Sequence, residues 1–83
     1  MQQPSKTESF PFLAALFAAN LQRYRKRMGL TRSELAARAG YTAGHLFMLE
    51  SGTRQPSFAA IEHLANALNV KDPRLFFRGG GKS

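Results

Sequence analysis

Cysteine is absent from this 83-residue chain, and acidic residues and histidines are few. Without cysteine the protein can form neither a disulfide nor a thiolate-bound zinc site, so packing alone must stabilise the fold. Five Asp/Glu and two His leave little material for acid–base catalysis or metal binding. We therefore expect a protein that is not an enzyme and needs no metal or cofactor. The lack of cysteine also fits a reducing cytoplasm.

Positive charge is what the chain has in excess. Twelve Lys/Arg against five Asp/Glu give a net charge of +7 and a pI near 10.9. Such an excess favours an acidic partner, most often nucleic acid and less often an anionic membrane surface. Hydrophobic residues make up 43% of the chain, which suffices for the packed core of one small domain.

The N-terminal third contains an apolar run over residues 10–21, which has two interpretations. Lys6 upstream and the small residues within the run give it the outline of a secretory signal. Glu8 and Pro11 interrupt that pattern, the run is too short to span a bilayer, and the apolar spacing continues beyond it. We favour a helix over residues 9–28, capped by Ser9 and ended by Gly29. Its predicted buried stripe consists of Leu13, Leu16, Phe17, Leu21, Tyr24 and Met28.

Four shorter helices are predicted from their capping residues. Thr31 and Glu34 have the spacing of a capping box, which starts a helix over residues 32–39 that ends at Gly40. The next is expected from Thr42 to Gly52. Ser57 caps a fourth helix, whose predicted buried stripe is Phe58, Ile61, Leu64, Ala65 and Leu68. Asp72 and Pro73 start the fifth, with Leu75 and Phe76 inward. The prediction is an all-α domain over residues 9–78, between a flexible arm (1–8) and a flexible tail (79–83).

The most informative segment covers residues 31–52, where two short helices joined by a tight turn would leave the second one exposed. This segment and its surroundings contain a series of short motifs: Gly29-Leu30-Thr31, Ser33-Glu34-Leu35-Ala36, Gly40, Glu50-Ser51-Gly52, Pro56-Ser57 and Leu64-Ala65-Asn66-Ala67-Leu68. With these motifs the chain resembles, over residues 17–76, a five-helix, lambda-repressor-like helix-turn-helix domain of the XRE (Cro/repressor) family. The resemblance implies a regulator that binds double-stranded DNA with the third helix in the major groove.

The resemblance also implies roles for individual residues. Arg25 and Glu50 match an ion pair that links the first and third helices. Four residues match positions that contact phosphates: Arg32 at the start of the second helix, Thr42 capping the third, and Arg54 and Gln55 in the following loop. The face that reads bases would consist of Ala43, Gly44, His45, Phe47 and Met48.

That face departs from the family pattern, which usually offers Gln, Arg, Asn or Ser to base edges. Ala43 and Gly44 allow close approach of the backbone, and Phe47 and Met48 can contact thymine methyl groups. Specificity would then depend on Arg32, on His45 or on DNA shape. The alternative is a protein-binding adaptor or antitoxin-like module that uses the exposed Phe47 and Met48.

Other features have simpler interpretations. His63 is expected at the surface, and the basic run 23–27 is either a solvated face or a source of long-range attraction to DNA. Residues 79–83 resemble the end of a phosphate-binding loop but lack its upstream glycine and following helix. The chain has more aromatic residues than a minimal five-helix domain needs, namely Phe10, Phe12, Phe76 and Phe77. These residues predict either a larger core or a dimer interface. We expect a cytoplasmic, nucleoid-associated homodimer that represses transcription, since two-fold symmetry doubles the DNA site.

Overall fold

The computed structural model describes residues 11–79, and within them every regular element is helical. Four α-helices follow one another as α1 (Pro11–Arg27), α2 (Arg32–Ala39), α3 (Ala43–Ser51) and α4 (Phe58–Ala67). A 3-10 helix, η2 (Pro73–Phe77), comes last. The all-α class is therefore confirmed. The predicted arm at 1–8, the Ser9 cap, Phe10 and the tail beyond residue 79 lie outside the described residues.

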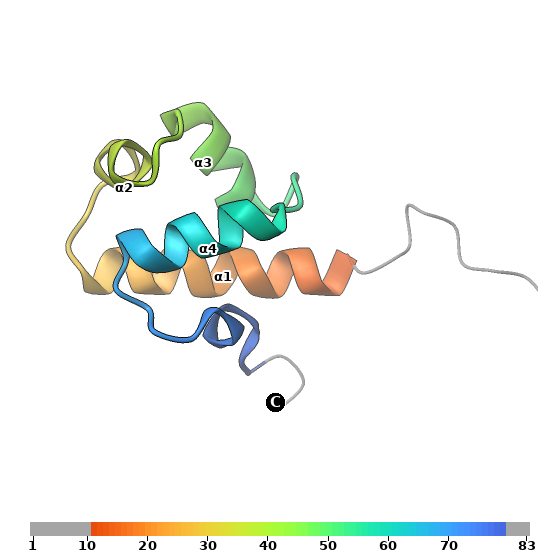
Figure 1. Ribbon diagram of the computed structural model, residues 1–83. Coiled ribbons are helices and arrows are strands. Elements are labelled where there is room, and N and C mark those ends of the chain that lie inside the picture. The colour runs from red at the N-terminus through yellow and green to blue at the C-terminus, as the bar shows by residue number, and fades with distance from the viewer. Residues whose placement is uncertain (1–10, 80–83) are drawn as a thin grey trace, which may run out of the picture.

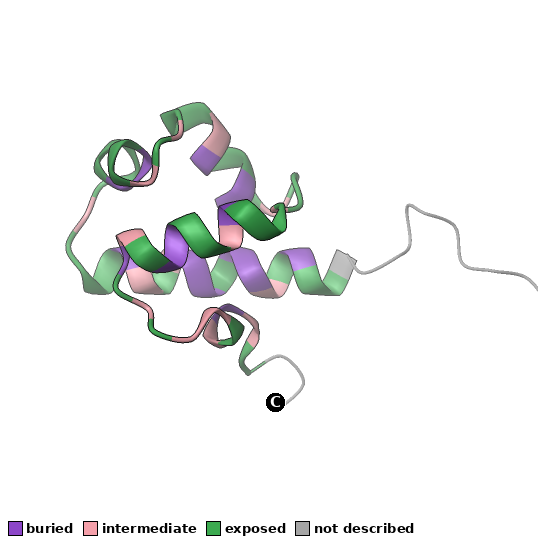
Figure 2. Ribbon diagram, viewed as in Figure 1, coloured by how far each residue is buried: buried purple, intermediate pink, exposed green. Residues whose placement is uncertain are grey.

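The long helix α1 is the element around which the others are arranged (Figure 1). In that view α2 and α3 lie on one side of α1, and η2 lies on the other. Helix α3 packs against both α1 and α2, while α4 packs against α2 and η2. This arrangement leaves α3 supported from one side only, as the burial pattern in Figure 2 also shows.

One hydrophobic core joins all five elements. Its fully buried side chains include Phe17 of α1 and Phe76 of η2, whose rings meet edge to face with centroids 5.1 Å apart. The other core members are Leu21, Leu35, Ala36, Leu46, Leu49, Leu64, Ala65 and Leu68. Burial of each large side chain contributes about 1.5–3 kcal/mol, so this cluster is the main source of stability in a chain without disulfides.

Three expectations about buried residues need correction. The apolar spacing predicts Phe58 in the buried stripe of α4, but this residue is 87% exposed because the first residue of α4 projects away from the core. The same spacing predicts Leu13 and Met28 in the buried stripe of α1, yet both are 39% exposed. The buried face of α1 instead includes Ala14, Ala18 and Asn20, small or polar residues that let neighbouring elements approach closely.

The fifth helix also differs from the prediction, because it is a 3-10 helix rather than an α-helix. Pro73 cannot donate a backbone hydrogen bond, and the bonds that form span three residues, such as Leu75 N–H to the Asp72 carbonyl at 2.9 Å. Asn20 fixes this turn onto α1: its side-chain amide donates to the carbonyls of Phe76 (2.7 Å) and Arg78 (3.1 Å). The C-terminal segment is thus an integral part of the fold.

Candidate nucleic-acid interface

Local capping interactions define both helices of the α2–turn–α3 segment. The Thr31 hydroxyl accepts a hydrogen bond from the Glu34 N–H at 3.0 Å, and the Glu34 carboxylate accepts from the Thr31 N–H at 2.8 Å. Gly40 ends α2 in the left-handed conformation, with φ of 82°. Thr42 then caps α3 by accepting from the His45 N–H at 3.0 Å. The predicted bounds of both helices are confirmed to within a residue.

Glu50, near the end of α3, is the point at which three helices are joined. Arg25 of α1 donates from Nε to Glu50 Oε2 (2.6 Å) and from Nη2 to Oε1 (3.0 Å). Arg32 of α2 donates from Nε to the same Oε1 at 2.9 Å. The Glu50 side chain is only 1% exposed, so both of its oxygens depend on these arginines. The orientation of α3 on the domain is set by this carboxylate and by a bond from the Gln22 amide to the Glu50 carbonyl.

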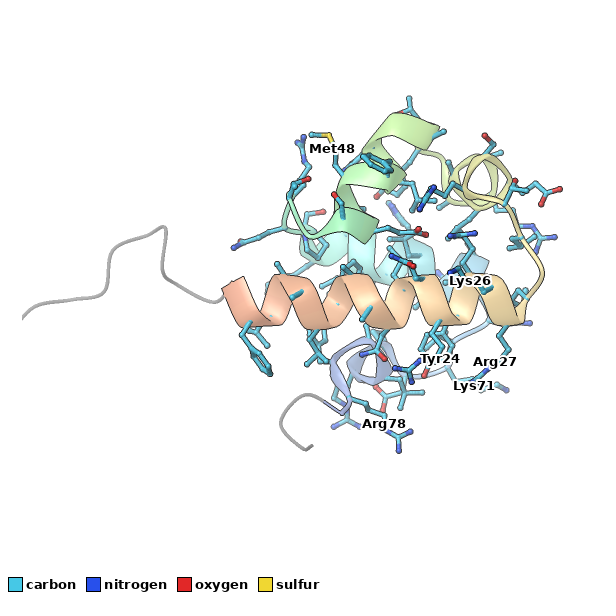
Figure 3. The ribbon with its side chains drawn as sticks, turned by 180° about the vertical axis from the view of Figure 1, so that it is seen from behind. Tyr24, Lys26, Arg27, Met48, Lys71 and Arg78 are labelled. Atoms are coloured by element: carbon cyan, nitrogen blue, oxygen red, sulfur yellow. The ribbon has the colours of Figure 1, made fainter. Side chains whose placement is uncertain are left out.

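The face of α3 that points away from the domain carries little hydrogen-bonding capacity. Leu46, Leu49 and Glu50 point inward, whereas the exposed residues of α3 are Ala43, Gly44, Phe47, Met48 and, at its C-terminal end, Ser51. The side chains of Phe47 and Met48 are 53% and 40% exposed, and Figure 3 shows Met48 extending from α3 away from α1. The space around Gly44 is open, with no atom within 4 Å of where a Cβ would lie.

Arg32 has contacts that sequence reasoning missed. Besides its bond to Glu50, its guanidinium lies over the Phe47 ring, 5.3 Å from the centroid. The side chain remains 43% exposed, so it can still contact a phosphate. Position 32 therefore combines an exposed charge with a fixed orientation. No sequence signal indicated this arrangement, because the partners are 15 and 18 residues away along the chain.

Two histidines, His45 and His63, contact Tyr41, which is in the turn between α2 and α3. The Tyr41 hydroxyl lies 2.9 Å from Nδ1 of His63 on α4. Its ring meets the His45 ring edge to face at 4.9 Å. His63 is exposed, as predicted, but His45 is half-buried rather than fully on the outward face. The turn is thereby tied to α4 as well as to α3.

The loop after α3 is held against the end of that helix. The Arg54 N–H donates to the Met48 carbonyl at 3.3 Å, and the Ser51 and Thr53 hydroxyls lie 2.9 Å apart. The Arg54 and Gln55 side chains are exposed. Gln55 borders an apolar hollow that also contains Leu13, Phe58 and Phe77.

The basic residues are spread over more than one face. In Figure 3, Arg27, Lys71 and Arg78 lie on the opposite side of α1 from Met48. Long-range attraction to a polyanion is therefore not confined to α3, whereas the close contacts at α3 can involve only the cations beside it.

Among ionisable groups near the turn, Glu34 has a pKa below its ordinary value, chiefly because it accepts the Thr31 backbone and hydroxyl hydrogen bonds.

Comparison with known proteins identifies the segment. A family model described as a helix-turn-helix domain matches residues 16–75, most of the chain. The chain belongs to the helix-turn-helix family of transcriptional regulators. Its relatives include the HTH-type transcriptional regulator y4dJ of Sinorhizobium fredii, 38% identical over 60 residues that cover 72% of this chain and 78% of that protein. An HTH-type transcriptional regulator of Methanothermobacter thermautotrophicus is 40% identical over 65 residues, 75% of this chain and 94% of that protein.

A solved structure supports the same family at the level of the fold. The restriction-modification controller protein C.AhdI from Aeromonas hydrophila superimposes with a TM-score of 0.73 at 31% identity, covering 77% of this chain and 96% of C.AhdI. In helix-turn-helix regulators the second helix of the motif binds in the major groove of DNA. The second helix of the motif in this chain is α3.

Within residues 11–79 no three metal-ligating side chains come together. None of the helices in the same range is long and apolar enough to cross a membrane.

Proposed function

We propose that this helix-turn-helix protein is a sequence-specific, homodimeric regulator that represses transcription by occupying double-stranded DNA near a promoter. The observation that carries the proposal is the one-sided support of α3. Its inward residues are bound by α1 and α2, and its outward residues Ala43, Gly44, Phe47 and Met48 are exposed. A helix held in this way can enter the major groove without rearrangement of the fold. Such a protein would work in the cytoplasm, associated with the nucleoid.

The residues around α3 divide into two groups by chemistry. Arg32, Thr42, Arg54 and Gln55 would bind phosphates, and these contacts fix the register of the protein on the duplex. Thr42 suits this role because its oxygen already accepts the capping bond, which leaves its O–H free to donate. The outward residues of α3, with His45 beside them, would lie against base edges.

The dimer interface would lie around Phe58, the first residue of α4. Phe58 is the most exposed of the large hydrophobic residues in the described part of the chain. It borders an apolar hollow together with Leu13, Pro56 and Ile61. Exposed apolar surface of this kind is typical of a protein interface, and a symmetric pair would place two α3 helices on one face of the duplex.

Selection from a random duplex DNA pool at about 150 mM salt tests the proposal, because this ionic strength suppresses unspecific attraction to a chain of charge +7. An enriched inverted repeat is the expected result, and its half-site would give the sequence read by one α3. Enrichment of no motif would contradict sequence-specific regulation. Repression is tested separately, with a reporter gene placed behind the enriched site.

A second candidate function is protein binding through α3. The observation in its favour is the exposed pair Phe47 and Met48, because neither side chain can form the bidentate hydrogen bonds that distinguish base pairs. In that case Phe47→Ala would abolish capture of a protein partner and leave DNA affinity unchanged.

A further inference from the structure

The outward face of α3 is chemically unusual for a helix that reads DNA. Positions 43, 44, 47 and 48 carry a methyl group, a hydrogen atom, a phenyl ring and a thioether. None of these groups donates a conventional hydrogen bond, so the donor and acceptor pattern of the major groove cannot be read by them. The groove also carries one apolar feature, the C5 methyl group of thymine. An apolar face can discriminate between bases through this group.

The Phe47 ring is held in place by a charged neighbour. The Arg32 guanidinium lies 5.3 Å from the ring centroid, and its Nε is bonded to the buried Glu50 carboxylate. A planar cation over an aromatic face is attracted by the ring and restricts its rotation. Within residues 11–79 the protein hydrogen bond of the Arg32 head is made by Nε, which leaves Nη1 and Nη2 to bind a DNA oxygen.

We propose that Phe47 recognises the C5 methyl group of a thymine in the major groove, and that Arg32 positions the Phe47 ring while it binds an adjacent phosphate. This inference rests on the proposed DNA-binding function and adds the chemical group that is read. Arg32 then has two separable effects. Its charge contributes to affinity for every sequence, and its stacking on Phe47 contributes to the preference for thymine.

The test removes the methyl group alone. The probe is the duplex enriched from the random pool, synthesised once with thymine and once with uracil at every thymine position. Uracil keeps the O4 acceptor of thymine, so hydrogen bonding is unchanged. Loss of one buried methyl contact is expected to weaken binding about fourfold per half-site. The Phe47→Ala variant should bind the two duplexes equally. Phe12→Ala, which removes a similarly exposed ring from α1, should preserve the thymine preference.

Arg32→Lys separates positioning from charge. Lysine keeps the positive charge but lacks the planar group that stacks on an aromatic ring. We expect this variant to keep the salt dependence of binding and to lose most of the difference between the thymine and uracil duplexes. If it instead keeps the full difference, Arg32 does not position Phe47.

The outcomes distinguish the inference from the function on which it rests. An enriched motif with equal affinity for the thymine and uracil duplexes would overturn methyl recognition and leave DNA-binding regulation intact. Failure to enrich any motif, together with unchanged DNA affinity of Phe47→Ala, would overturn both and favour the protein-binding role of α3.

Discussion

Arg25 and Glu50 form a two-point ion pair between α1 and α3, with donor–acceptor distances of 2.6 and 3.0 Å. Both residues are buried, at 7% and 3% exposure. Arg25 also donates from Nη1 to the Leu30 carbonyl at 2.9 Å, so it fixes the connection between α1 and α2 as well. The contact thus couples the stability of the core to the orientation of α3, the second helix of the helix-turn-helix motif.

Glu50→Ala should destabilise the domain by about 3–5 kcal/mol, because the buried Arg25 guanidinium would lose its counter-charge. A loss of that size is a large part of the total stability of a small domain. Urea unfolding followed by circular dichroism measures it. Glu62→Ala, which removes an exposed carboxylate from α4, serves as the matched control and should have little effect. Similar unfolding midpoints for the two variants would contradict a structural role for the pair.

Phe58→Ser should shift the protein from dimer to monomer without loss of stability, because the side chain is 87% exposed in the single chain and dimerisation would cover it. Sedimentation equilibrium gives the association constant of each variant. Met28→Ser removes an exposed apolar side chain at the end of α1 and should leave association unchanged. If the Phe58→Ser variant still forms a dimer with unchanged affinity, the dimer interface does not include Phe58.

Arg54→Gln should reduce the slope of the logarithm of the binding constant against the logarithm of salt concentration by about one, because one phosphate contact is lost. Lys71→Gln removes the same charge on the opposite side of α1 from Met48 (Figure 3) and should leave that slope unchanged. The measurement is a salt titration of binding to one duplex. Equal slopes for the two variants would mean that the loop after α3 does not contact the DNA backbone.

Acid should weaken the domain partly through Glu34. Its pKa in the folded state is below the ordinary value of 4.5 because of the Thr31 hydrogen bonds. The ionised carboxylate therefore stabilises the fold above about pH 4.5, and this contribution is lost as pH falls through the lowered folded pKa. Glu34→Gln keeps a capping-box side chain without the charge. Its unfolding free energy should fall less steeply with acid than that of the natural protein. Parallel curves would exclude a role for Glu34 in acid unfolding.

The sequence was most informative where structure is determined by neighbouring residues. Thr31, Thr42 and Ser57 each cap the helix predicted for them, and Gly29, Gly40 and Gly52 adopt the positive φ expected where helices end. These signals act over three or four residues, so they can be recognised without knowledge of the tertiary fold.

Tertiary partners were harder to predict. The contacts of Arg32 with Glu50 and Phe47, and of Asn20 with the η2 carbonyls, join residues from 15 to 58 positions apart. Helical periodicity also failed at the helix ends: Phe58, Leu13 and Met28 have the spacing of buried residues, but the core does not extend far enough to cover them. The roles of the outward α3 residues in binding bases stay predictions.

Gly44 lowers the stability of α3, although the space around this residue within the described domain does not require glycine. Gly44 is the second residue of α3, where glycine destabilises the helix by at most about 1 kcal/mol relative to alanine, and the open space at this position would accept a larger residue. Alanine there should give a more stable but otherwise similar monomer. If α3 lies in the major groove as proposed, a methyl group at position 44 would stand between the α3 backbone and the DNA. Gly44→Ala would then raise the thermal stability of the domain and weaken its binding in a single substitution.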